Sequence, residues 1–370
     1  MVKTISISEY FLLDPAVPII DVRTPVEFAQ GHIPHALNVP LFSNEERIAV
    51  GTTYKQAGRE EAILLGFDLT GNKWSDFIKQ ALAIAPMKKI AVQCWRGGMR
   101  SGTMAWALDL YGFEVYTIQG GYKSYRGWAL NQFIQPFNLN MLGGMTGSNK
   151  TMILHELQSL NEQVLDLEEL AQHQGSSYGT MNKLVQPTQE QFENNFAFQL
   201  SKFNADKPVW VEDESLTIGK RCIPNPFFSQ MRHAILIKLD VPLEQRIDKL
   251  TKEYGVLDKD FLIACTERIR KRLGPEQTKH ALHAIQENRM TDFITLVLYY
   301  YDKTYHAGLN KRDAAKIFTL PLEIENPANN AKRVLEFANG LHHDNKLYDV
   351  IASSPLKNKT DTDENGIKRN

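Results

Sequence analysis

Residues 90–101 read IAVQCWRGGMRS, and this stretch decides how the first half of the chain folds. Its apolar start predicts a buried strand that ends near Cys94, and the pattern beginning at Arg100 and Ser101 predicts a helix. A loop between a strand end and a helix start directs backbone N–H groups inward, and the helix dipole adds partial positive charge there. We therefore predict an anion-binding loop around Cys94.

Cys94 is the candidate catalytic residue of this loop. Positive charge from Arg96, Arg100 and the helix start favours the thiolate, which is the reactive form of cysteine. Two adjacent glycines allow the backbone to wrap closely without a clashing Cβ atom. We expect the donor anion to contact the loop residues Trp95, Arg96, Gly97, Gly98, Met99 and Arg100. A buried structural cysteine beside a turn is the alternative interpretation.

Two upstream segments favour the catalytic interpretation. Residues 21–23 read DVR after an apolar run, and residues 27–40 read EFAQGHIPHALNVP. Together with the cysteine loop they resemble the rhodanese domain, which implies an α/β fold with a catalytic cysteine. Cys94 and Arg100 are six positions apart, as in rhodanese-fold phosphatases, whereas many sulfurtransferases have five. The larger loop fits a tetrahedral oxyanion better, which favours a phosphate-bearing donor over thiosulfate.

The composition predicts a soluble chain with two domains. The 370 residues are 43% apolar and 23% charged with a net charge of −1, so any RNA contact needs local basic patches. The three cysteines, Cys94, Cys222 and Cys265, form no closely spaced pair, which argues against a zinc site or a disulfide framework. The sequence has no signal-peptide pattern and no apolar run of transmembrane length, so we expect a cytoplasmic protein without membrane association.

The hydrophobic pattern divides the chain into two α/β domains. In the first, residues 1–138, we predict strands at 18–22, 36–39, 89–94 and 115–118 and helices at 60–65 and 73–85. We interpret residues 123–138 as a polar and aromatic connector. Residues 139–355 follow as a parallel α/β domain of the P-loop NTPase type with a helical, basic extension. Residues 356–370 are almost free of apolar side chains, which predicts a disordered tail.

A phosphate-binding loop opens the second domain. Residues 139–151 read LNMLGGMTGSNKT, which matches the P-loop pattern G-x-x-x-x-G-K-[ST] except that Asn149 replaces the second glycine. Asparagine tolerates the left-handed backbone region better than most residues with a Cβ atom. A glycine-rich turn before an ordinary helix is the alternative. We predict diphosphate binding by Gly144, Thr146, Gly147, Ser148, Asn149, Lys150 and Thr151.

Acidic and basic residues further along suggest two more functions. The apolar run at 209–211 ends in three acids, of which Glu212 and Asp213 are the candidates for Mg²⁺, unless they form a solvent-exposed turn. Further strands are predicted at 234–239 and 317–322, and a last helix at 329–341. Helical segments after residue 243 carry basic residues that could neutralise RNA phosphates or simply face solvent. They include Arg246, Lys249 and Lys252, and the proposed tRNA-binding cluster of Arg268, Arg270, Lys271 and Arg272.

Several motifs in the second half are similar to those of the tRNA 2-selenouridine synthase family. They are GGMTGSNKT (143–151), LDLEELAQH (165–173), GSSYG (175–179), FEN (192–194) and EDES (212–215), beside CWRGGMRS (94–101). The resemblance extends over about residues 19–305. The sequence departs from the family pattern at Gln174, where an arginine is expected, which puts a phosphate contact in question.

This resemblance implies a two-step reaction on tRNA that carries 2-thiouridine at the wobble position. The sulfur is first geranylated with geranyl diphosphate, and the geranylthio group is then replaced by selenium from selenophosphate, giving 2-selenouridine. Mg²⁺ and a selenophosphate-producing enzyme are further expected partners. Candidates for a geranyl groove are Phe192, Phe196 and Phe198, or residues 299–301, although core packing explains most of them. The competing hypothesis is a Cys-dependent sulfurtransferase or phosphatase with a nucleotide-binding regulatory domain, and whether the P-loop prefers a nucleotide or a prenyl diphosphate stays open.

Overall fold

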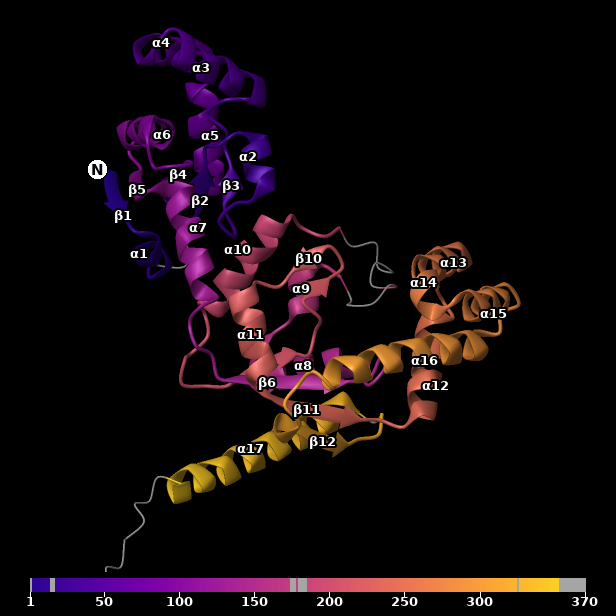
Figure 1. Cartoon of the computed structure of the whole chain (residues 1–370). Coiled ribbons are helices and arrows are strands. Elements are labelled where there is room, and N and C mark those ends of the chain that lie inside the picture. Colours follow the sequence, from indigo (N-terminus) through magenta and orange to yellow (C-terminus); the bar gives the residue numbers. More distant parts are fainter. Residues whose placement is uncertain (1, 14–16, 174–177, 179–184, 325, 353–370) are drawn as a thin grey trace, which may run out of the picture.

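Two separate parallel sheets organise the chain (Figure 1). The structure is a computed structural model that describes residues 2–13, 17–173, 178, 185–324 and 326–352. The predicted tail at 356–370, Gln174 and most of the GSSYG motif lie outside the described residues. Apolar runs with few polar interruptions form the central strands of both sheets, as expected for parallel strands that are covered on both faces.

The first sheet has the order β1-β5-β4-β2-β3, and all its neighbouring strands are parallel. Its strands are β1 (Val2–Ile5), β2 (Ile19–Asp21), β3 (Leu37–Asn38), β4 (Lys89–Gln93) and β5 (Glu114–Ile118). Its helices are α1 (Ile7–Phe11), α2 (Pro25–Gln30), α3 (Asn44–Gln56), α4 (Arg59–Thr70), α5 (Trp74–Ile84), α6 (Met99–Leu110) and α7 (Gly121–Gln132). The four predicted strands and both predicted helices are confirmed within a few residues, whereas the mostly exposed edge strand β1 was not predicted.

The second sheet has the order β12-β11-β6-β8-β7 and is also parallel throughout. Its strands are β6 (Leu139–Gly144), β7 (Gln163–Leu165), β8 (Val209–Glu212), β11 (Ile235–Asp240) and β12 (Ile317–Pro321). A small antiparallel pair joins β9 (Thr217–Ile218) to β10 (Arg221–Cys222). The accompanying helices are α8 (Lys150–Ser159), α9 (Leu167–Ala171), α10 (Gln189–Leu200), α11 (Asn225–His233) and α17 (Pro327–Ala352), with a short 3₁₀ turn at Ala314–Lys316. The predicted strands and the last helix are confirmed.

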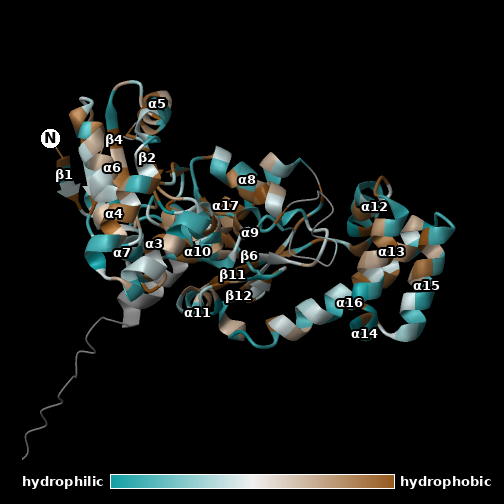
Figure 2. Ribbon diagram, turned by 90° about the horizontal axis from the view of Figure 1, so that it is seen from above, coloured by the Kyte–Doolittle hydropathy of each residue, from teal (hydrophilic) through white to brown (hydrophobic). Residues whose placement is uncertain are grey.

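A helical module is inserted between β11 and β12 and projects from the second sheet (Figures 1 and 2). It consists of α12 (Leu243–Tyr254), α13 (Lys259–Arg268), α14 (Arg270–Leu273), α15 (Pro275–Gln286) and α16 (Met290–Leu309). Its helices bury a core of their own that includes Leu262, Ile285 and Phe293, and hydrophobic and hydrophilic residues alternate along their ribbons (Figure 2). None of the helices in the described ranges is long and apolar enough to cross a membrane.

The prediction of a connector at 123–138 was wrong, because helix α7 fills most of this segment. Tyr122, Tyr125, Ala129 and Phe133 recur every three or four residues and are all buried. This apolar stripe packs on α10 of the second half, as the edge-to-face contact of Phe133 with Phe196 illustrates. The aromatic residues that suggested an irregular linker therefore form the seam between the two halves.

Candidate active sites

Cys94 lies directly after β4, at the carboxyl edge of the first sheet. Its side chain is only 3% exposed, and Sγ lies 3.1 Å from the hydroxyl of Ser101 at the start of α6. The loop is also held from the other side by the first turn of α7. The N–H of Tyr122 donates to the carbonyl of Cys94 (2.8 Å), and the N–H of Lys123 donates to that of Trp95 (3.0 Å). The predicted loop between strand and helix is confirmed.

Glycines allow the loop and α7 to approach each other. Gly97 has φ +66, and a Cβ atom there would lie 2.7 Å from the carbonyl oxygen of Ile118. Gly121 has φ +58, and its Cβ would lie 2.1 Å from the carbonyl oxygen of Cys94. Both positions therefore require glycine for backbone conformation and for space. Gly98 has open space around it, so its expected contribution to close wrapping is absent.

The two loop arginines lie in different environments. Arg100 is mostly buried and binds both carboxylate oxygens of Glu27, at 2.7 and 3.2 Å. Burial acts to raise the pKa of Glu27, but hydrogen bonds from Arg100 and from the N–H of Thr24 outweigh it, so the pKa is lowered. Arg96 is exposed at the loop surface, as are Trp95 and Met99. Arg96 is therefore the loop arginine with access to a bound anion, while Arg100 shapes the loop through Glu27.

The P-loop connects β6 to α8 as the sequence predicts. Asn149 has φ +67, which confirms the left-handed conformation expected where it replaces glycine, and Gly147 has φ +85. Lys150 donates from Nζ to the carbonyl of Gly144 (3.1 Å) and lies 3.4 Å from Glu212. Burial acts to lower the pKa of Lys150, but nearby glutamates outweigh it and raise the pKa. A charged lysine and the free N–H groups of α8 thus converge on one anion-binding position.

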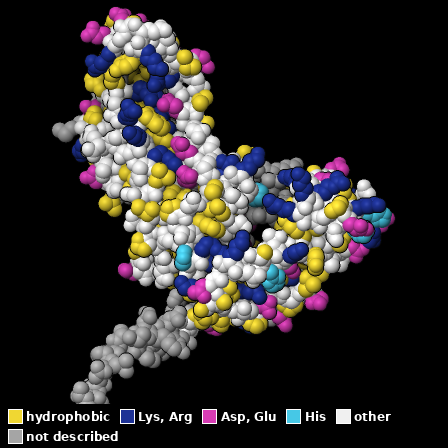
Figure 3. All heavy atoms as spheres, viewed as in Figure 1, with side chains coloured by type: hydrophobic (Ala, Val, Ile, Leu, Met, Phe, Trp, Pro, Cys, Tyr) yellow, Lys and Arg dark blue, Asp and Glu magenta, His cyan; other side chains and the backbone are white. Residues whose placement is uncertain are grey.

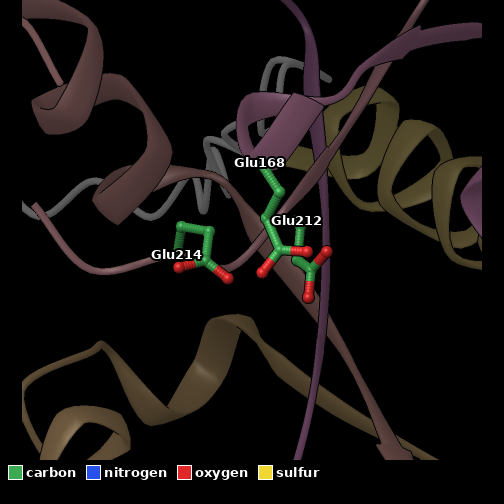
Figure 4. A group of neighbouring side chains, drawn as sticks. All are labelled: Glu168, Glu212 and Glu214. Carbon is green, nitrogen blue, oxygen red and sulfur yellow. The ribbon is translucent and has the colours of Figure 1, made fainter. Parts of the chain in front are cut away.

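Three glutamates meet beside this lysine: Glu168 of α9, Glu212 at the end of β8, and Glu214 just beyond it. One carboxylate oxygen from each lies within 4.8 Å of the others, and Figure 4 shows the three groups pointing into the same space. Burial, followed by mutual repulsion, raises the pKa of Glu168 to about 9 and that of Glu214 to about 8. Thr151 donates to Glu212 at 3.5 Å. Such a group of hard oxygen ligands suits a divalent cation, whose charge would favour the ionised carboxylates.

Asp213, which we predicted beside Mg²⁺, lies among arginines instead. It accepts a hydrogen bond from Arg312 (2.5 Å) and lies 3.7 Å from Arg232. Of the two predicted carboxylates, Glu212 belongs to this group and Asp213 does not, because alternate residues at a strand end point in opposite directions. Glu212 and Glu214 come together with Glu168, whereas Asp213, which lines the same cavity, pairs with Arg232 and Arg312. We did not predict Glu168 as a site residue, although it lies in the LDLEELAQH motif (165–173), which begins at the end of β7.

A cavity of about 1140 Å³ opens at this site. Its lining combines the P-loop and the three glutamates with apolar and aromatic side chains, namely Leu216, Phe228, Tyr301, Tyr305 and Leu309. Among the predicted geranyl-groove residues, Tyr301 lines this cavity. Phe192 and Phe196 are fully buried in the core, and Phe198 packs on Phe11 and His35. The cavity therefore joins an anion-binding region to an apolar wall.

The basic cluster lies on the helical module, at the end of α13 and along α14. Arg268, Arg270, Lys271 and Arg272 are all exposed, and Figure 3 shows dark blue Lys and Arg side chains on this part of the surface. Arg246, which we grouped with the basic face, is buried instead. It binds Asp302 of α16 through two hydrogen bonds (2.9 and 2.8 Å) and the carbonyl of Thr146 (3.2 Å), so it fastens the P-loop to the helical module.

Known proteins match both halves of the chain. Residues 11–127 match the rhodanese-like domain, and residues 137–323 match the family described as the tRNA 2-selenouridine synthase AAA domain. A protein from Nitrosomonas europaea named tRNA 2-selenouridine synthase is 40% identical over 273 residues, which cover 70% of this chain and 68% of that protein. The chain belongs to the tRNA 2-selenouridine synthase family. A member from Shewanella frigidimarina is 35% identical over 359 residues, 86% of this chain and 96% of its own length.

Family membership confirms the fold prediction of a rhodanese-like domain followed by a P-loop domain. The two sites described above lie one in each matched segment. A relative from Nitrosomonas eutropha, also named tRNA 2-selenouridine synthase, is 33% identical over 361 residues, so the similarity spans both of them.

Proposed function

We propose that this enzyme converts wobble 2-thiouridine of tRNA to 2-selenouridine in two steps, with S-geranyl-2-thiouridine between them. Geranylation is assigned to residues 139–355 and selenium transfer to residues 1–138. The observation that carries the proposal is the cavity beside Lys150, which offers both a diphosphate position and an apolar wall. The relatives' shared name supports the overall reaction.

In the first step the sulfur on C2 of the base attacks C1 of geranyl diphosphate. A C–S bond forms, the C–O bond breaks, the diphosphate leaves with the electron pair, and the N3 proton of the base is released to water. Gly144, Lys150 and the N–H groups at the start of α8 would bind the diphosphate, and Leu216 and Phe228 would contact the geranyl chain. A Mg²⁺ ion held by Glu168, Glu212 and Glu214 would supply positive charge to the leaving group.

In the second step selenium takes the place of the geranylthio group. Overall a C2–Se bond forms, the C2–S bond breaks so that geranylthiol leaves, and water accepts the phosphoryl group of selenophosphate as phosphate. The thiolate of Cys94 serves this transfer, because it is a soft nucleophile set in an anion-binding loop. Arg96 and the loop N–H groups hold the phosphoryl oxygens, and Arg100 keeps the loop in shape through Glu27.

The exposed cluster on α13 and α14 is proposed to hold the tRNA through its phosphates, with Arg268, Arg270, Lys271 and Arg272 as the contacts. An enzyme that makes selenophosphate is a proposed partner, because the donor has to be supplied.

The test is a Lys150→Ala variant assayed separately on each step. With 2-thiouridine tRNA and geranyl diphosphate, mass spectrometry of the nucleosides should find no S-geranyl product. With tRNA that is already geranylated, the variant should still form 2-selenouridine at close to the wild-type rate. Failure on both substrates would show that Lys150 serves tRNA binding or folding, and normal geranylation would remove it from the reaction.

A further inference from the structure

No residue of the FEN motif at 192–194 lines the P-loop cavity, and the motif contacts the first half of the chain instead. It sits on α10, whose buried residue Asn194 faces α7. From the structure we infer that α10 is a positioning element for the Cys94 loop, acting through Asn194, Glu190 and Tyr122. This inference rests on the proposed role of Cys94 in selenium transfer.

Tyr122 is the link between the two halves. Its N–H holds the carbonyl of Cys94 (2.8 Å), and its ring, which is fully buried, covers the guanidinium of Arg23 at 3.8 Å. Its hydroxyl donates to Glu190 (2.6 Å) and accepts from the side-chain amide of Asn194 (2.7 Å). The same residue therefore binds the catalytic loop through its backbone and α10 through its side chain.

Asn194 and Arg23, which contact Tyr122, are each held by several further bonds. The second amide hydrogen of Asn194 goes to the carbonyl of His32 (2.9 Å), and its oxygen accepts from Arg126 (2.7 Å). Arg23 is buried and binds both oxygens of Asp21 and the carbonyl of Gly31 (2.7 Å). Buried networks in which every member is bonded are rigid, because any displacement leaves a polar group without a partner.

The rhodanese signature GHIP is part of this junction. A Cβ atom at Gly31 would lie 2.6 Å from the hydroxyl of Tyr122 and 2.8 Å from Cγ of Glu190, so glycine permits the close approach. The N–H of His32 donates to Gln191 (2.8 Å), and Thr188 donates to the carbonyl of Gln30 (2.5 Å). Residues of the GHIP motif in the first domain and their neighbour Gln30 thus contact the amino end of α10, which belongs to the second domain.

The experiment uses the full-length Asn194→Ala variant. On geranylated tRNA we expect kcat/KM for selenophosphate to fall at least about tenfold, since a displaced loop moves both Cys94 and the groups that hold the donor. Geranylation of 2-thiouridine tRNA should stay within about twofold of wild type. Iodoacetamide should label Cys94 of the variant at least about threefold faster than Cys94 of the wild type, because the loosened loop exposes the thiol. Peptide mass spectrometry measures the labelling rate.

Gln230→Ala is the matched control. Gln230 of α11 also joins the two halves, through the carbonyls of Phe133 (3.2 Å) and Gln135 (2.9 Å) and the N–H of Phe137 (3.0 Å), but it does not touch the Cys94 loop. The Gln230→Ala substitution should lower the melting temperature without changing geranylation, selenium transfer or the labelling rate. Glu190→Gln keeps an acceptor for the Tyr122 hydroxyl and should remain close to wild type, whereas Glu190→Ala should behave like Asn194→Ala and serves in its place if that variant does not fold.

The inference is overturned if Asn194→Ala and Glu190→Ala leave labelling and selenium transfer unchanged, or if Gln230→Ala changes them equally. The labelling rate reports loop position whether or not the thiol takes part in the reaction. A failure of the proposed function of Cys94 is therefore distinguishable from a failure of the positioning role.

Discussion

Replacing Gly121 with alanine should disable selenium transfer while leaving geranyl transfer intact. Gly121 starts α7 with φ +58, and an added Cβ would lie 2.1 Å from the carbonyl oxygen of Cys94 and 2.5 Å from the nitrogen of Gly97. Cβ contacts shorter than 3.0 Å are essentially never found in proteins, so the backbone of the cysteine loop has to move by about 1 Å.

The magnitude follows from this displacement. The left-handed backbone costs an alanine about 1–2 kcal/mol, which lowers the melting temperature by a few degrees. A shift of about 1 Å at a catalytic group reduces a rate by about 100-fold. We therefore expect selenium transfer to fall by about 100-fold in a protein that is still folded at the assay temperature.

The assay follows conversion of geranylated tRNA with selenophosphate, in parallel with geranylation of 2-thiouridine tRNA. Gly127→Ala is the control, because Gly127 lies on the same helix, is exposed, and has no neighbour within 4 Å of a Cβ atom. Alanine there should stabilise the helix by about 0.5–1 kcal/mol and leave both steps unchanged. Wild-type selenium transfer by Gly121→Ala would refute the reasoning, and so would an equal loss in the control.

Two further outcomes are expected. Without divalent cations the melting temperature should fall as pH rises from about 5 to about 8, because the folded state keeps protons on Glu168 and Glu214 that the unfolded chain releases near its ordinary value of 4.5. Scanning calorimetry should show that added Mg²⁺, or the substitution Glu214→Gln, makes the melting temperature less dependent on pH. A melting temperature that does not fall between about pH 5 and about pH 8 would contradict the raised pKa values of this cluster. Reversing the charges of Arg270 and Lys271 should weaken tRNA binding and make the slope of log affinity against log salt shallower by roughly 1–2. Filter-binding titrations would show an unchanged slope if these side chains only face solvent. The control is Lys79→Glu, because the Lys79 side chain is 71% exposed and lies on the first domain.

Local sequence was enough to predict the two loops. The cysteine loop and the P-loop each combine an apolar strand, a glycine-rich turn and a helix start within about a dozen residues, so their geometry depends on neighbours in sequence. The left-handed Asn149 was predictable for the same reason, since its conformation is a property of the residue and of the motif.

Long-range contacts were not predictable in this way. The partner of Arg100 is Glu27, which is 73 positions away, and α7 was taken for a connector because its buried face contacts α10 about 70 residues later. The choice between Asp213 and Glu214 depended on how the chain leaves β8 relative to the P-loop. The sequence of three consecutive acids does not indicate which of them face Lys150. Glu168 comes close to Glu212 and Glu214 because β7 pairs with β8, which is a contact between distant parts of the chain.

The most direct test of the proposed division of labour is a nucleoside assay of Cys94→Ser. Serine keeps nearly the size and shape of cysteine but has no thiolate at neutral pH. Supplied with 2-thiouridine tRNA, geranyl diphosphate and excess selenophosphate, the variant should accumulate S-geranyl-2-thiouridine and form no 2-selenouridine, as measured by mass spectrometry. Normal formation of 2-selenouridine would remove the Cys94 thiol from the reaction, and loss of geranylation as well would contradict the assignment of the two steps to two separate sites.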